Sequence, residues 1–134
     1  MPKFKLAILA AAIFLSAGSF TQDCEYQQGV DAYLQGDYVR AADHYYKAAT
    51  AGHAKAQNNL AAMYFMGQGV TEDALNAQMW AEIAHSNGVN SAKGFKIVFA
   101  AELNDVEVKL ASALAHECKS SGYSFCGMKA YASN

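Results

Sequence analysis

The side chains best able to do chemistry in this sequence are its histidines and cysteines, but their spacing does not match a common reactive site. No two histidines form a His-x-x-x-His pair and no two cysteines form a Cys-x-x-Cys pair, so neither metal-ligand spacing is present. Gly67-Gln68-Gly69 is a connection between helices and lacks the pattern of a phosphate loop. His116-Glu117-Cys118 could place a base beside a thiol nucleophile, although Cys118 has another explanation given below. We therefore predict no catalytic, metal-binding or cofactor-binding residue. The histidines are His44, His53, His85 and His116.

The composition is that of one folded domain with no nucleic-acid or lipid-surface partner. The 134 residues are 53% hydrophobic and 16% charged, with Pro2 as the single proline, which disfavours a disordered chain. The formal net charge is −2, and the lysines and arginines form no cluster. A weakly acidic chain of this kind is a poor ligand for nucleic acid or for an anionic membrane.

The first residues predict an export signal. Lys3 and Lys5 precede the apolar run LAILAAAIFL, and small residues follow at 16–19. The run is shorter than the ~20 residues that span a bilayer, so we predict a signal peptide over 1–19 and a mature domain over 20–134. An uncleaved N-terminal anchor is the alternative. Cys24 does not directly follow the small residues, so we expect no lipid anchor and no stable membrane attachment after cleavage.

A repeated pattern organises the rest of the chain. Segments that begin at Ala41, Ala77 and Ala111 align, and their glycines coincide at Gly52, Gly88 and Gly122. Periods of 36 and 34 residues are typical of a solenoid of helical hairpins. Glycine can end a helix in the left-handed conformation, and alanine lets helices approach closely. We predict an all-α fold with helices at 25–35, 38–51, 54–66, 74–87, 90–103 and 106–120, and a short capping helix at 125–132.

These residues resemble the Sel-1-like repeat family, which is related to the tetratricopeptide repeats. The segment KAATAGHAKAQNNLAAMYFMGQGV from Lys47, followed by a helix with Ala77 and Trp80, carries the pattern most clearly. The third unit is degenerate, because Ile97 and Ala100 replace the usual glycine and tyrosine. The resemblance covers roughly residues 24–126 and implies a right-handed α-α superhelix of about three repeats that serves as a binding scaffold.

The repeat register also bears on the cysteines. Cys118 and Cys126 take the places of Ala84 and Ala92, where two helices approach closely beside a glycine turn. Small facing side chains at such a crossing lie near the ~4 Å separation of Cβ atoms that a disulfide needs. Cysteine-rich secreted members of the family are similar, with bridges at this spacing, so we predict a Cys118–Cys126 disulfide. Two buried free thiols are the alternative. Cys24 is then a buried apolar filler or an exposed thiol that could join two chains.

The resemblance implies a non-enzymatic protein that binds a protein or peptide in the bacterial cell envelope, in the periplasm or outside the cell. In related repeats the first helix of each hairpin lines the concave face. By that analogy the candidate partner-binding residues are Tyr26, Tyr33, Asn58, Phe65 and Met66, with Val30 beside them. A β-lactam-interacting hydrolase is one alternative, although the sequence has no Ser-x-x-Lys motif. A structural envelope assembly factor is another.

Overall fold

Six α-helices make up the part of the chain that the structure describes, and that part contains no β-strand. The structure is a computed structural model that describes the backbone of residues 2–126 and the side chains of residues 18–126. The helices are α1 (Pro2–Leu34), α2 (Tyr38–Thr50), α3 (Ala54–Met66), α4 (Ala74–Ser86), α5 (Ala92–Ala100) and α6 (Asp105–Ser120). The all-α repeat fold predicted from the sequence is confirmed.

Polar side chains fix where four of the helices begin. Asp37 accepts a hydrogen bond from the third backbone N–H of α2, and Asp73 does the same for α4. His53 caps α3 through its Nδ1 atom. Asn104 and Glu107 form a reciprocal capping box at the start of α6. Each cap satisfies a backbone donor that has no partner inside the helix, so these loops end at defined residues.

The three predicted glycine turns adopt one shared geometry. Gly52, Gly88 and Gly122 have φ angles of +93°, +96° and +65°, the left-handed region that glycine enters without strain. After each glycine, the next backbone N–H donates to a carbonyl five residues earlier, on Ala48, Ala84 and Cys118 respectively. These equivalent bonds end α2, α4 and α6 in the same way. The repeat register deduced from the sequence is therefore present in the backbone.

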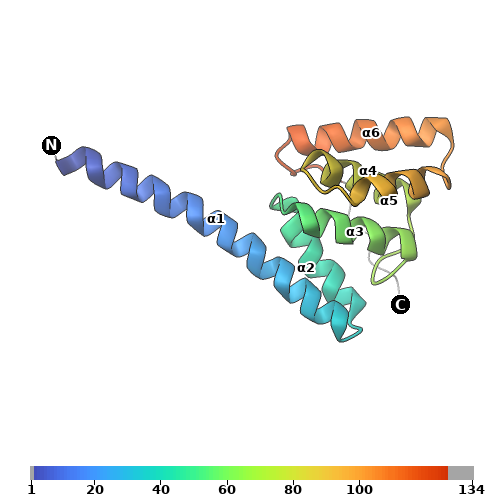
Figure 1. Cartoon of the computed structure of the whole chain (residues 1–134), viewed down its shortest axis with the longest axis horizontal. Coiled ribbons are helices and arrows are strands. Elements are labelled where there is room, and N and C mark those ends of the chain that lie inside the picture. The colour runs from blue at the N-terminus through green and yellow to red at the C-terminus, as the bar shows by residue number, and fades with distance from the viewer. Residues whose placement is uncertain (1, 127–134) are drawn as a thin grey trace.

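The helices stack in chain order, with alanines at their crossings. Helix α1 packs on α2, α2 on α3 and α3 on α4, whereas α5 and α6 both pack mainly against α4 (Figure 1). Trp80, Tyr64 and Leu60 are among the largest fully buried side chains and fill the space between layers. Several alanines at the crossings are also fully buried, including Ala41, Ala48, Ala56, Ala77, Ala84, Ala92 and Ala111. Small residues at these contacts allow close approach of the backbones.

Two helices differ clearly from the expected boundaries. Helix α1 begins at Pro2 instead of near residue 25, because the alanine- and leucine-rich start favours helix and no proline follows it. Its N-terminal half extends away from the other helices (Figure 1). Helix α5 is shorter than 90–103: Ser91 provides no side-chain cap, and Ile97 and Val98 are weak helix formers.

The predicted capping helix at 125–132 lies mostly outside the described residues. Phe125 and Cys126 are not helical. Within the described residues, no helix has the length and apolar character needed to cross a membrane.

Candidate functional site

A hollow lies where α1, α2 and α3 meet, and two of the predicted partner-binding residues line it. Its volume is about 210 Å³. Tyr33 of α1, Tyr45 of α2 and four residues of α3 form its walls, the last being Asn59, Ala62, Met63 and Met66. Met66 is 51% exposed at its rim, whereas Met63 and Tyr45 are buried in its floor. We call this the Tyr33 hollow. Its size and lining suit one large apolar side chain.

Hydrogen bonds hold the aromatic walls of the Tyr33 hollow in place. The Tyr33 hydroxyl donates to Oε1 of Gln68, in the loop that follows α3, at 3.2 Å. Burial raises the pKa of the Tyr45 phenol, and its hydrogen bond to Asn59 only partly opposes that effect. The Tyr45 hydroxyl therefore stays neutral and available as a donor over the physiological pH range. The hollow combines an apolar interior with oriented phenol and amide groups.

A second hollow of about 480 Å³ lies at the start of α3. We call it the His53 hollow. Its walls include Asp23, Tyr26 and Gln27 of α1, together with His53 and Lys55. Tyr26 stacks on the imidazole of His53, with ring centroids 4.4 Å apart. This stack joins α1 to the N-terminal end of α3.

Both nitrogens of the His53 imidazole are engaged. Nδ1 accepts the backbone N–H of Ala56 at 3.1 Å, and Nε2 lies 3.2 Å from Oδ1 of Asp23. Burial lowers the pKa of His53, and the attraction of the nearby Asp23 carboxylate opposes this shift without cancelling it. Because Nδ1 acts as an acceptor, the ring proton of the neutral form sits on Nε2. His53 thus serves as a helix cap and as a wall of the hollow.

The two hollows lie along one side of α1. Tyr26 and Tyr33 are seven residues apart, which is two helical turns or about 10 Å. Both hollows also border α3, and we call the pair of hollows the α1–α3 groove. A partner helix with anchor residues at i and i+7 has the same spacing, as does an extended segment with anchors at i and i+3.

The five predicted residues do not all reach this groove. Tyr33 and Met66 meet in one hollow and Tyr26 lies in the other. Phe65 turns toward α5 and stacks on Phe99 with ring centroids 4.3 Å apart. Asn58 lies seven residues before Phe65 and is half-buried, and its Oδ1 has no hydrogen-bond partner among the residues that the structure describes.

Sequence reasoning missed Asn59 and His53 as groove residues. Asn59 lies seven residues before Met66 and so shares its helix face, a signal that could have found it. From the sequence, His53 is only one of four histidines without metal-ligand spacing.

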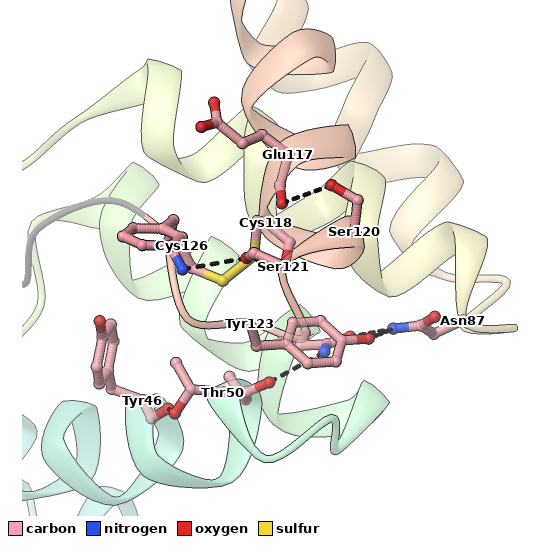
Figure 2. The surroundings of a disulfide bond; sticks show 12 residues. Tyr46, Thr50, Asn87, Glu117, Cys118, Ser120, Ser121, Tyr123 and Cys126 are labelled. Carbon is pink, nitrogen blue, oxygen red and sulfur yellow. Dashed lines mark hydrogen bonds between the residues drawn. A yellow bond between two sulfur atoms is a disulfide. The ribbon is translucent and has the colours of Figure 1, made fainter.

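The predicted Cys118–Cys126 disulfide is present, and it encloses the last glycine turn (Figure 2). The Cα atoms of the two cysteines are 4.6 Å apart. Cys24 is a free thiol and is exposed, so its interpretation as a buried filler is wrong. Its sulfur accepts a hydrogen bond from Gln28, one turn further along the same exposed face of α1. Within the described residues, no group of three or more His, Cys, Asp or Glu side chains could hold a metal ion.

A chain of polar side chains connects the three glycine turns. Asn87 uses both amide hydrogens, donating to Oε1 of Gln57 at 2.8 Å and to the Tyr123 hydroxyl at 2.9 Å. Figure 2 shows Asn87 and Tyr123 side by side. Gln57 is fully buried and in turn donates to the backbone carbonyl of Ala49 at 3.1 Å. The Tyr123 ring also lies against Gly52. We call Gln57, Asn87 and Tyr123 the turn ladder, because it holds the ends of α2, α4 and α6 together.

Comparison with protein families agrees with this repeated geometry. The Sel1 repeat model matches residues 9–53 and 54–89. The chain belongs to the Sel1 repeat family. The two Sel1 matches end directly after Gly52 and Gly88, and the third hairpin, whose sequence is degenerate, is not matched. No curated protein and no solved structure matches the chain. Sel1 repeats generally mediate protein–protein interaction, which assigns a protein-binding scaffold to this fold.

Proposed function

We propose that the chain is an exported scaffold that binds a protein or peptide segment of the bacterial cell envelope in the α1–α3 groove. The observation that carries this proposal is the pair of hollows two helical turns apart, one apolar and one aromatic with charged edges. Their spacing fits an amphipathic helix that inserts residues i and i+7, a common mode of peptide recognition. Tyrosine and methionine, which dominate the Tyr33 hollow, are also enriched in protein interfaces.

Two features support export to the periplasm or beyond. The basic and apolar N-terminal segment has the order of a secretory signal, ending near residue 19. The disulfide is of a kind that forms and persists in oxidising compartments. A signal over 1–19 would remove the half of α1 that extends away from the other helices, and leave Tyr26 and Tyr33 in place.

We further propose that the groove binds without catalysis. Its polar groups are phenols, amides, the Asp23 carboxylate, the Lys55 ammonium and the imidazole of His53, whose two nitrogens are already engaged by Ala56 and Asp23. A base held in this way cannot also activate a nucleophile without giving up the cap of α3.

Site-specific photo-cross-linking tests the proposal in the producing bacterium. A benzophenone amino acid is placed at Met66, on the rim of the Tyr33 hollow, or at Ile97, which is exposed on α5. We expect a defined adduct with one envelope protein at Met66, none at Ile97, and loss of the adduct when Tyr33→Ala is added. Cell fractionation should place the adduct outside the cytoplasm.

Other outcomes would contradict the proposal. Equal adducts at both positions, or none at either, would remove the groove as the interface. Turnover of nitrocefin by the purified wild-type chain, blocked by a serine or thiol reagent, would contradict binding without catalysis.

A further inference from the structure

A separate cleft, lined by both charged and apolar residues, lies between α4 and α6, the second helices of two successive repeat units. Its volume is about 470 Å³. Glu82 and Ser86 of α4 face Ser112 and Lys119 of α6 across it. It shares no lining residue with the α1–α3 groove. We call it the α4–α6 cleft.

The carboxylate of Glu82 is held in place by neutral donors. The Ser112 hydroxyl lies 2.8 and 2.9 Å from its two oxygens, and Nε2 of Gln78 donates to it at 3.2 Å. Gln78 is 2% exposed, and its own Oε1 has no hydrogen-bond partner among the described residues. The buried Gln78 amide donates to Glu82 although its own oxygen atom has no partner, and this contact favours a fixed position for the Glu82 carboxylate.

The cleft also holds an ammonium group that does not neutralise this carboxylate. Nζ of Lys119 donates to the Ser86 hydroxyl at 2.8 Å. Within the part of the chain that the structure describes, neither Glu82 nor Lys119 takes part in an ion pair. The two opposite charges are therefore each bound to a serine and remain available to a ligand that carries the complementary pair.

The spacing of the two charges limits the ligand. Helices α4 and α6 run in the same direction at this cleft, because Glu82 of α4 contacts Ser112 and the later residue Ser86 contacts the later residue Lys119. Glu82 and Ser86 are four residues apart on α4, a rise of about 6 Å. Two extended residues span up to about 7 Å, so a dipeptide separates its amino and carboxyl groups by a similar length. His116 and Ser120 also line the cleft and can meet the central amide.

We propose that the α4–α6 cleft binds a short peptide through both of its free termini, with the amino group on Glu82 and the carboxylate on Lys119. Charge-assisted hydrogen bonds are the strong polar contacts of proteins, so this pair sets specificity for a zwitterion. The site is independent of the partner proposed for the α1–α3 groove.

NMR titration of the mature chain tests this assignment with three probes: Ala-Ala, its N-acetylated form and its C-terminal amide. We expect saturable shifts of the Ser112 and His116 backbone amide signals with Ala-Ala. Blocking either terminus should weaken binding by roughly tenfold or more, because each block removes a charge-assisted hydrogen bond.

Matched variants identify the two charges. Glu82→Gln should abolish the preference for a free amino group, and Lys119→Met the preference for a free carboxylate. Lys93 is exposed on α5, so Lys93→Met serves as the control for loss of a charge. This variant should keep the cleft signals in its NMR spectrum and should bind Ala-Ala as the unmodified chain does. Tyr33→Ala should also leave Ala-Ala binding unchanged. The experiment therefore separates a failure of the partner-binding proposal for the α1–α3 groove from a failure of the peptide-binding proposal for the α4–α6 cleft. No saturable shift at millimolar Ala-Ala, or equal binding of all three probes, would overturn the proposal.

Discussion

Replacement of Asn87 by alanine is expected to lower the free energy of unfolding by about 2–3 kcal/mol, although Asn87 is only half-buried. The change removes two hydrogen bonds of the turn ladder, each worth about 1 kcal/mol net. It also leaves Oε1 of the fully buried Gln57 without its donor, which costs a further ~1 kcal/mol or more. The backbone itself tolerates alanine, because Ala51 occupies the equivalent position before Gly52 with a similar conformation.

Urea unfolding of the mature chain, with the disulfide intact and helix content followed by circular dichroism, measures this effect. The slope of free energy against urea should stay the same, since the folded surface does not change. Asn90→Ala, an exposed substitution in the same loop, should alter stability by no more than about 0.5 kcal/mol.

A double-mutant cycle with Gln57→Leu isolates the contact between the two side chains. Each single variant leaves a polar group of its partner without the hydrogen bond between the two side chains, whereas the double variant removes both groups. The two losses should therefore fall short of additivity by about 1 kcal/mol. A loss below about 0.5 kcal/mol for Asn87→Ala, or full additivity in the cycle, would refute a stabilising role for the turn ladder.

Gly29→Ala should destabilise the fold by about 1–3 kcal/mol, because a Cβ there would lie 2.6 Å from the buried ring of Tyr45. Gly94→Ala on α5, where a Cβ would meet open space, should stabilise the fold by about 0.5–1 kcal/mol. A change of Tm with the same sign in both glycine variants would contradict these two expectations. The pKa of His53 is lower in the folded chain than its ordinary value of about 6.5, so stability is present above that pH and is lost as pH falls toward the folded pKa. His53→Asn, which can still cap α3, should flatten this slope in unfolding measured between about pH 7.5 and 5; an unchanged slope would rule out His53 as its source. Thiol titration under denaturing, non-reducing conditions should give one free thiol per chain, Cys24. Three would contradict the disulfide, and none together with a doubled mass would indicate a dimer linked through Cys24.

The features that were predictable from the sequence depend on local backbone geometry. A glycine at the same place in each unit marks a left-handed turn, and Gly52, Gly88 and Gly122 all have positive φ angles. The disulfide followed from the same register, since Cys118 and Cys126 replace a pair of alanines at a helix crossing. In both cases one position in the repeat constrains the backbone, so its residue type carries the signal.

The features that the sequence did not reveal depend on how neighbouring units stack. Asn87 contacts Gln57 and Tyr123 at separations of 30 and 36 residues, and these contacts require three turns to lie side by side. Phe65 was assigned to the concave surface with Tyr33, yet the packing of α5 turns its ring toward Phe99. Residue type and spacing define the face of a helix but do not determine which neighbour that face meets.

Cys24 shows the same limit at the end of the stack. The sequence left both a buried filler and an exposed thiol open for Cys24, and the thiol is exposed because α1 packs on α2 along one face only. The opposite face, which holds Cys24 and Gln28, has no covering element in the described structure.

The disulfide gives the two ends of the solenoid unequal resistance to opening. A linear stack of repeats unfolds most readily from its ends, because a terminal unit has one neighbour instead of two. At the last turn the Cys118–Cys126 bond keeps the segment with Tyr123 beside α6 even when its packing loosens. At the other end α1 is held by packing and side-chain contacts alone, and α1 is the helix that carries Tyr26 and Tyr33. The proposed binding groove thus lies at the end that opens first, where it can widen for a partner while the cross-linked end stays folded.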